Sequence, residues 1–343
     1  MNPIARQAFD AYSQRVSQLN GGANVATKFT VTPTTQQTLE QKTQETSEFL
    51  KLINVVGVPE LTGEKIGMGV NSTIAGRTDT TGNGRRVPRD PTALSSVDYL
   101  LKQTNYDVAL RYDKLDMWAK FPNFQTLWQG AIMERCALDR IMIGFNGTSA
   151  AATTDRAANP LLQDVNIGWL QDMRVNNAAR VMSEAVEDSE EITIGMGGDY
   201  RNLDALVMDA THSLLPSWMR TRSDLVAITG ADLLHDKYFQ KVNVDQAPSE
   251  EIALQTILAS RRLGGKQAMV VPYFPANGIF ITPLKNLSIY FQDGKRRRHI
   301  KEEPEADRVA DYNSSNDGYV IEDYDAALLL ENVRILDPED PEA

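Results

Sequence analysis

The sequence predicts an α+β protein built from an N-terminal arm, an extended β-hairpin, one long helix and a mixed α/β lobe. Residues 124–145 carry large apolar side chains at intervals of three and four, which is typical of a long amphipathic helix. Residues 1–50 are rich in Thr, Gln and Glu, and residues 203–292 alternate helix-like and strand-like segments. With 343 residues, 42% of them hydrophobic, the chain can bury a sizeable core in two or three lobes.

The arm begins with a helix expected over residues 1–20, which is thin in apolar surface and ends at Asn20, Gly21 and Gly22. Such a helix needs a partner, because a narrow apolar stripe cannot hold an isolated helix together. Two interpretations stay open: a contact with another protein, and a helix folded back on its own domain. The contact candidates are Phe9, Tyr12, Val16 and Leu19. A further helix is expected over residues 36–52.

An extended hairpin is expected to follow the arm. Residues 63–70 alternate apolar and polar side chains, and residues 106–111 are the expected return strand. An isolated hairpin is marginal in water, so a projecting one implies a neighbouring subunit, and packing on its own domain is the alternative. The stretch between the strands is crowded with glycine and proline. Its tip carries the candidate contact residues Arg77, Arg85, Arg86 and Arg89.

The long helix is expected to run between Asn123, as its N-cap, and Asn146 with Gly147, where the left-handed conformation would let it stop. A helix of this length is expected to act as a central spine, with other elements of the fold attached at both of its ends. A loop of small residues should follow, leading into a second helix from about residue 163.

The mixed lobe should contain a buried strand over residues 225–229, with a helix from Gly230 to residue 239. Another helix is expected over residues 248–261. Further strands are expected over residues 268–271, 279–282 and 287–291, followed by a tight turn at Asp293 and Gly294 and a last strand segment over residues 319–336.

Composition excludes several classes of protein. The net charge of −11 argues against wrapping nucleic acid with the whole surface, although a local basic patch could still contact it. The first residues do not form a secretory signal, and no apolar stretch is long enough to cross a bilayer. The single cysteine, Cys136, permits no internal disulfide and fits a small core residue in a reducing compartment.

No motif predicts a catalytic, cofactor or metal site. Gly195, Gly197 and Gly198 lack the spacing of a phosphate loop, and the three histidines are scattered without a metal-ligand spacing. Gly230 lies at a strand-to-helix junction that could bind an anion, but a tight turn explains it better.

The densest basic run follows the Asp293–Gly294 turn and is a further contact candidate. It could contact nucleic acid, but it lacks the interleaved aromatic residues that stack on bases. Pairing with the acidic segment 302–307, within the chain or across a subunit boundary, is the stronger interpretation. The run consists of Lys295, Arg296, Arg297 and Arg298, with His299 beside it.

Long blocks of sequence resemble one family over nearly the whole chain. They include GEKIGMGV at 63–70, GGDYRNLDALVMDA at 197–210, VPYFPANGIFITPLKNLSIY at 271–290 and EDYDAALLLENVRI at 322–335. These blocks resemble the major capsid proteins of temperate contractile-tailed phages of the P2 type.

The resemblance implies the Hong Kong 97 capsid fold. By position, the arm would be residues 1–55, the extended loop 56–112, the peripheral domain with its spine helix 113–200, and the axial domain 201–292. Residues 293–343 would supply the return strands of the peripheral domain and an acidic tail. The loop tip has arginines and no lysine between residues 73 and 89, so crosslinking between lysine and asparagine is not expected.

The implied function is self-assembly, as pentamers and hexamers, into the icosahedral head shell that encloses double-stranded DNA. Implied partners are an internal scaffold and prohead protease, which would cut the arm between about residues 20 and 31, and a portal protein. Assembly in the host cytoplasm is implied, with no membrane, no cofactor and no enzymatic activity. The alternatives are a nanocompartment shell of the same fold that packages protein cargo, and a nucleotide-using enzyme with its site near Gly230.

Overall fold

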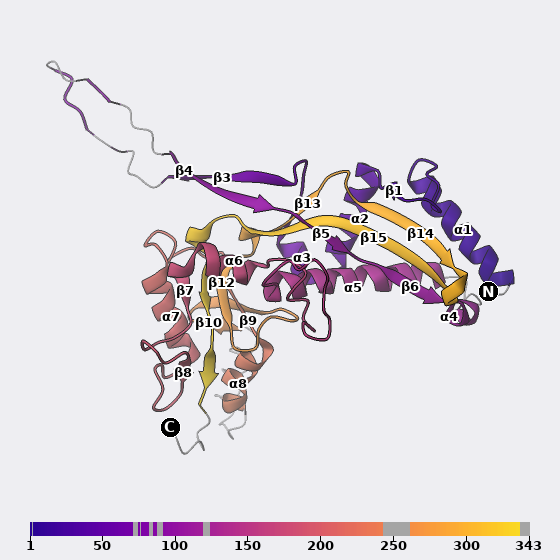
Figure 1. Ribbon diagram of the computed structural model, residues 1–343. Coiled ribbons are helices and arrows are strands. Elements are labelled where there is room, and N and C mark those ends of the chain that lie inside the picture. The colour runs from indigo at the N-terminus through magenta and orange to yellow at the C-terminus, as the bar shows by residue number, and fades with distance from the viewer. Residues whose placement is uncertain are drawn as a thin grey trace.

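The long helix predicted near the middle of the sequence lies at the centre of the fold. In the computed structural model it is α5 (Phe124–Asn146), which runs beneath a curved sheet that extends toward the N-terminal helix α1 (Pro3–Leu19) (Figure 1). The structure describes residues 1, 3–70, 75, 77–81, 85–87, 92–118, 124–242 and 261–336. The expected N-cap Asn123 therefore lies outside the described residues.

The far end of α5 differs from the sequence expectation. Neither Asn146 nor Gly147 has the left-handed backbone that was expected to end the helix. Gly147 is needed for a different reason, because a Cβ atom there would lie 2.2 Å from the carbonyl oxygen of Asn166. The next helix, α6 (Trp169–Asn176), begins later than expected, after a stretch of turns.

The sheet above α5 is seven-stranded, and its longest strand organises it. The order is β1-β14-β15-β13-β2, and β5 and β6 also pair with β15, which is why residues 106–111 are not the hairpin's return strand. The arm contributes the first and last strands of that order. The bounds are β1 Phe29–Thr30, β2 Asn54–Val58, β5 Lys102–Asn105, β6 Val108–Arg111, β13 Leu287–Gln292, β14 Arg297–Glu303 and β15 Arg308–Ile321.

The extended hairpin is present with a different return strand. β3 (Thr62–Val70) pairs antiparallel with β4 (Thr92–Leu100), and the pair projects away from the rest of the molecule (Figure 1). The root of the hairpin is held by the ring of Tyr99, which meets Tyr290 edge-on with centroids 5.2 Å apart, and by the buried Leu101. Alternation alone identified the first strand but could not say which later segment would pair with it.

Three helices of the arm and its neighbourhood lie around the same sheet. They are α2 (Pro33–Thr46), α3 (Glu48–Leu52) and α4 (Tyr112–Trp118). The helix expected over residues 36–52 is thus broken at Ser47, whose backbone is extended and caps α2.

The mixed lobe is built on a six-stranded sheet of order β10-β11-β9-β12-β16-β7. Its expected strands over residues 225–229, 268–271 and 279–282 are present, as is the helix after Gly230; the helix expected over 248–261 falls outside the described residues except for Arg261. The last expected segment divides between the end of β15, β16 and β17. The bounds are β7 Val181–Met182, β8 Ile192–Ile194, α7 Leu203–Leu214, β9 Leu225–Thr229, α8 Ala231–Val242, β10 Arg262–Leu263, β11 Lys266–Val270, β12 Ile279–Pro283, β16 Leu328–Leu330 and β17 Val333–Ile335.

Two hydrophobic cores lie on opposite faces of this six-stranded sheet. Along β12, Phe280 faces the core that contains Phe145 and Trp169, whereas its neighbours Ile279 and Ile281 face the core that contains α7. β9 and β16 alternate in the same way, so their side chains are buried on both faces and read as continuous apolar runs. Within the described part of the chain, no helix is long and apolar enough to span a bilayer.

Candidate functional site

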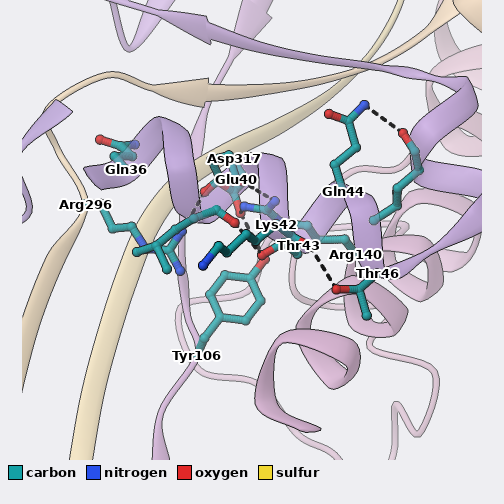
Figure 2. Close-up of polar contacts among 12 residues, drawn as sticks. Gln36, Glu40, Lys42, Thr43, Gln44, Thr46, Tyr106, Arg140, Arg296 and Asp317 are labelled. Atoms are coloured by element: carbon teal, nitrogen blue, oxygen red, sulfur yellow. Dashed lines mark hydrogen bonds and ion pairs between the residues drawn. The ribbon is translucent and has the colours of Figure 1, made fainter. Parts of the chain in front are cut away.

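Four charged side chains meet in the interior where α2, α5 and the seven-stranded sheet come together (Figure 2). Glu40 and Arg140 are each 3% exposed, Arg296 is 8% exposed and Asp317 is fully buried. Arg296 donates from Nη1 to Oε1 of Glu40 at 2.6 Å, and Arg140 donates to the other carboxylate oxygen of Glu40. Arg140 also lies 3.6 Å from Asp317. We call these four residues the buried charge cluster.

The environment of the cluster keeps its carboxylate charged. Burial by itself would raise the pKa of Glu40, but the facing guanidinium groups of Arg140 and Arg296 outweigh burial and lower it. Tyr106 donates its hydroxyl to Asp317 at 2.9 Å, and burial followed by the Asp317 charge raises the pKa of this phenol well above its usual value. The cluster is thus matched in charge and closed to solvent, which suits it to holding elements together rather than to catalysis.

Strand β14 alternates between two roles. One set of its side chains faces the arm helices. Arg298 donates from Nε to Asp311 at 3.0 Å and from Nη2 to the hydroxyl of Tyr12, and Arg6 of α1 donates both guanidinium nitrogens to Glu302 at 2.7 and 2.8 Å. The other set includes the exposed Arg297 and also His299, whose ring nitrogen lies 3.0 Å from the carbonyl oxygen of Ala26. β14 and the turn before it therefore form the surface on which the arm docks, and we call this surface the seat.

The basic run predicted as a contact surface is divided by this alternation. Lys295 and Arg297 are exposed, but Arg296 and Arg298 are turned into the chain and paired there. Within the described chain, Arg296 and Arg298 do not form the expected pairing with the acidic segment 302–307. The sequence suggested it because the segments are adjacent, but Arg296, just before β14, pairs with Glu40 of the arm, and Arg298 on β14 pairs with Asp311 of β15.

The acidic segment has other partners. Glu302 pairs with Arg6, and Glu303 lies 2.7 Å from Arg308 and 3.8 Å from Lys301. These contacts stabilise the turn between β14 and β15.

The arm candidates mostly face their own chain. Val16 is buried against Ile300 and Val309, and Phe9 and Tyr12 pack on the same cluster, whereas Leu19 is 52% exposed. Of the two interpretations left open for this helix, the structure has α1 folded back on its own domain.

The hairpin tip remains turned to solvent where it is described. Arg77, Arg85 and Arg86 are exposed, and among the described residues no ion pair joins them to a carboxylate of the chain. Arg89 lies outside the described residues.

The features considered for an enzyme have structural explanations. A Cβ atom at Gly230 would lie 2.7 Å from the carbonyl oxygen of Ala276, so a close backbone approach requires glycine there. His299 lies 3.0 Å from the carbonyl oxygen of Ala26 and stacks on Tyr312. Among the described residues, no group of His, Cys, Asp or Glu could hold a metal ion.

Cys136 lies on α5 in a groove that it shares with Trp128, Arg135 and residues of β5 and β6. It is partly exposed and not a fully buried core residue, and burial raises the pKa of its thiol above the ordinary value. This thiol is therefore weakly nucleophilic.

Sequence reasoning missed the buried charge cluster. Two signals were present: Gln36, Glu40 and Thr43 follow helical spacing with polar side chains, and Arg140 interrupts the apolar pattern of α5 between Ala137 and Ile141. Neither signal identifies the partners, because Arg296, just before β14, and Asp317, on β15, lie far along the chain.

Comparisons with known proteins agree on one family. A family model described as "Phage major capsid protein, P2 family" matches residues 8–333. The protein named "Capsid proteins" of Escherichia phage P2 is 48% identical over 344 residues, covering 98% of this chain and 96% of that protein. The "Major capsid protein" of Serratia phage KSP20 is 44% identical, covering 99% of each chain.

Solved structures agree with these matches. A chain of the "Satellite phage P4 procapsid including size determination (Sid) protein" is 46% identical, with a TM-score of 0.82, and covers 98% of this chain and 99% of its own. The capsid of an empty GTA particle is 16% identical with a TM-score of 0.50, covering 84% of this chain and 90% of its own, and shows a similarity of fold alone.

Proposed function

The chain belongs to the P2 family of phage major capsid proteins, and from this premise we propose which of its surfaces join copies into a shell. Its relatives are structural proteins of the virion, and the chain is a shell protein rather than an enzyme. The phage match also favours a phage head over a nanocompartment that packages protein cargo. The contacts between copies follow from the surfaces that the single chain leaves unpaired.

The hairpin tip is the first proposed contact. β3 and β4 carry it away from the body, and Arg77, Arg85 and Arg86 stay exposed at its end (Figure 1). With 46 acidic and 35 basic residues in the chain, a neighbouring copy offers a surplus of carboxylates. Arginine binds carboxylates through two parallel hydrogen bonds, which fixes orientation as well as adding energy. This unpaired, projecting cationic tip is the observation that carries the proposal.

The outward side chains of the basic run are the second proposed contact. Lys295 and Arg297 are available to a neighbour, whereas Arg296 and Arg298 are already engaged with Glu40, Asp311 and Tyr12. Contacts repeated around rings can close a shell from one kind of chain, and weak contacts act together when each copy has many neighbours.

A charge reversal tests the hairpin proposal. Arg85→Glu with Arg86→Glu should reduce closed particles at least tenfold in electron micrographs, because the tip would repel a neighbour's carboxylates. The matched control, Arg85→Lys with Arg86→Lys, keeps the charge and should retain most assembly. Unfolding of both unassembled variants should match the parent chain, since Arg85 and Arg86 are exposed. Normal shells from the charge-reversed chain would refute this contact.

We propose the remaining partners from the family. The shell would consist of pentamers and hexamers assembled in the host cytoplasm around an internal scaffold and prohead protease, with a portal protein and double-stranded DNA. The domains would be the arm at 1–55, the loop at 56–112, the peripheral domain at 113–200 and 293–343, and the axial domain at 201–292. Co-expression with the phage's own scaffold and portal tests these partners, and closed heads that exclude both would count against them.

For the arm, Leu19 and the polar outer face of α1 are the scaffold contacts that remain, and residues 21–28 form the link where trimming would occur. Deleting residues 1–20 should reduce particles of the correct size. Unaltered particles would leave α1 without a scaffold role.

A further inference from the structure

Helix α2 is held against the body by polar side chains. The residues that it buries are Gln36, Glu40 and Thr43, at 0%, 3% and 6% exposure. Leu39 is its one large apolar residue, and it is only partly buried. The short helix α3 that follows is different, because it buries Phe49 and Leu50 in the core with α5.

Gln36 and Glu40, two of the three buried polar residues of α2, have partners outside the helix, whereas the hydroxyl of Thr43 donates to the carbonyl oxygen of Leu39 within it. Gln36 donates from Nε2 to the carbonyl oxygen of Gln292 at 3.0 Å and accepts from the amide of Gly294 at 2.9 Å. Glu40 binds Arg140 of α5 and Arg296 of the turn before β14 (Figure 2). These directional hydrogen bonds and ion pairs therefore fix the position at which α2 docks.

Such an interface differs from apolar packing in what happens when it opens. A helix docked through apolar side chains exposes them to water when it leaves, at a cost proportional to their area. A helix docked through amides and ion pairs exposes groups that water hydrates well, and the desolvation of a buried ion pair offsets most of its attraction. The position of α2 is thus well specified while the net free energy that holds it is small.

We propose that α2 is a releasable element latched by Glu40: it leaves α5 and the seat as a unit and returns, while α3 stays anchored in the core. Release would bare Arg140 and Arg296 without opening either hydrophobic core, while α1 and β1 keep their own contacts with β14. The proposal goes beyond the assembly contacts above, because it concerns a movement within one chain and holds whether or not those contacts form.

Hydrogen exchange of the unassembled chain, read by mass spectrometry, tests the movement. Peptides from residues 33–46 should exchange at least tenfold faster than peptides from β9 and β12, because α2 opens on its own. Glu40→Gln should speed exchange of α2 at least tenfold further and leave β9 and β12 unchanged. The matched control is Glu45→Gln on the exposed face of the same helix, which should change nothing.

A charge-balanced apolar variant separates a latch from a merely structural contact. Glu40→Leu with Arg296→Met removes one negative and one positive charge and leaves Arg140 facing Asp317. This variant should slow exchange of α2 at least tenfold, because apolar burial replaces a costly ion pair. Exchange of α2 as slow as that of β9 in the parent chain, or no slowing in the apolar variant, would overturn the proposal.

Discussion

At the scale of single residues, glycines set how closely α5 and the segment before α6 approach. A Cβ atom at Gly144 would lie 2.3 Å from the ring of the fully buried Trp169, and one at Gly168 would lie 2.4 Å from the carbonyl oxygen of Gly144. Trp169 also donates its indole N–H to the carbonyl oxygen of Ser288 at 3.1 Å, which fixes the ring in place. The close crossing thus depends on residues without side chains.

We expect Gly144→Ala to lower the free energy of unfolding by about 1–3 kcal/mol, because the ring of Trp169 would have to move within a packed core. Denaturant unfolding of the unassembled chain measures this. Gly130→Ala is the matched control on the same helix, where a Cβ atom meets nothing within 4 Å. It should raise stability by up to about 1 kcal/mol, since alanine favours the helix. Equal effects at the two positions would contradict this account.

At the scale of elements, the docking of α2 should depend on pH and should weaken under acidic conditions. The carboxyl of Glu40 has a lowered pKa, so its contribution is complete above its ordinary value of 4.5 and is lost as pH falls below that value through the lowered one. Of the groups that face it, Arg140 has a raised pKa and stays charged, Tyr106 and Cys136 have raised pKa values and stay neutral, and Arg296 is the second guanidinium. Asp317 is the other carboxyl nearby.

The parent chain should therefore lose more stability between pH 7 and pH 3 than the Glu40→Leu, Arg296→Met variant, which lacks the titrating carboxyl. Urea unfolding at several pH values gives the free energy of unfolding of each chain as a function of pH. The difference between these two curves is the relevant quantity, because both chains contain all the other carboxylates. If the free energy of unfolding fell equally with pH in both chains, the protonation of Glu40 would not be coupled to folding.

Element patterns in the sequence could predict much of the fold. The apolar spacing predicts α5 and the alternation predicts β3, because each pattern is typical of an element with one apolar face. The continuous apolar runs predict β9 and β12 as strands buried on both faces. The structure confirms these four elements. The partner of β3 could not be predicted, because alternation does not select between residues 92–100 and 106–111. The charge cluster could not be predicted either, since the contact between Arg296 and Glu40 joins residues 256 positions apart in the sequence.

At the scale of the whole molecule, the two hydrophobic cores share one sheet. Side chains of β9, β12 and β16 enter both cores alternately, so neither core can open without disturbing the same strands. The described chain should therefore unfold as one cooperative unit, although its length alone would suggest separate domains.

Truncation of a large side chain in either core tests this. Phe145→Ala in one core and Leu206→Ala in the other should each cost about 2–5 kcal/mol and shift the same single transition. Near- and far-ultraviolet circular dichroism should follow superimposable curves. Two resolved transitions, each moved by only one of the variants, would show that the cores fold independently.

The lone thiol of Cys136 has a practical consequence. Because the chain has one cysteine, a maleimide dye attaches at one defined place, in the groove beside α5. The raised pKa makes the reaction slow at neutral pH and faster as the pH rises and more of the thiol becomes thiolate. A fluorophore placed there would report on the surroundings of α5 without any engineered mutation.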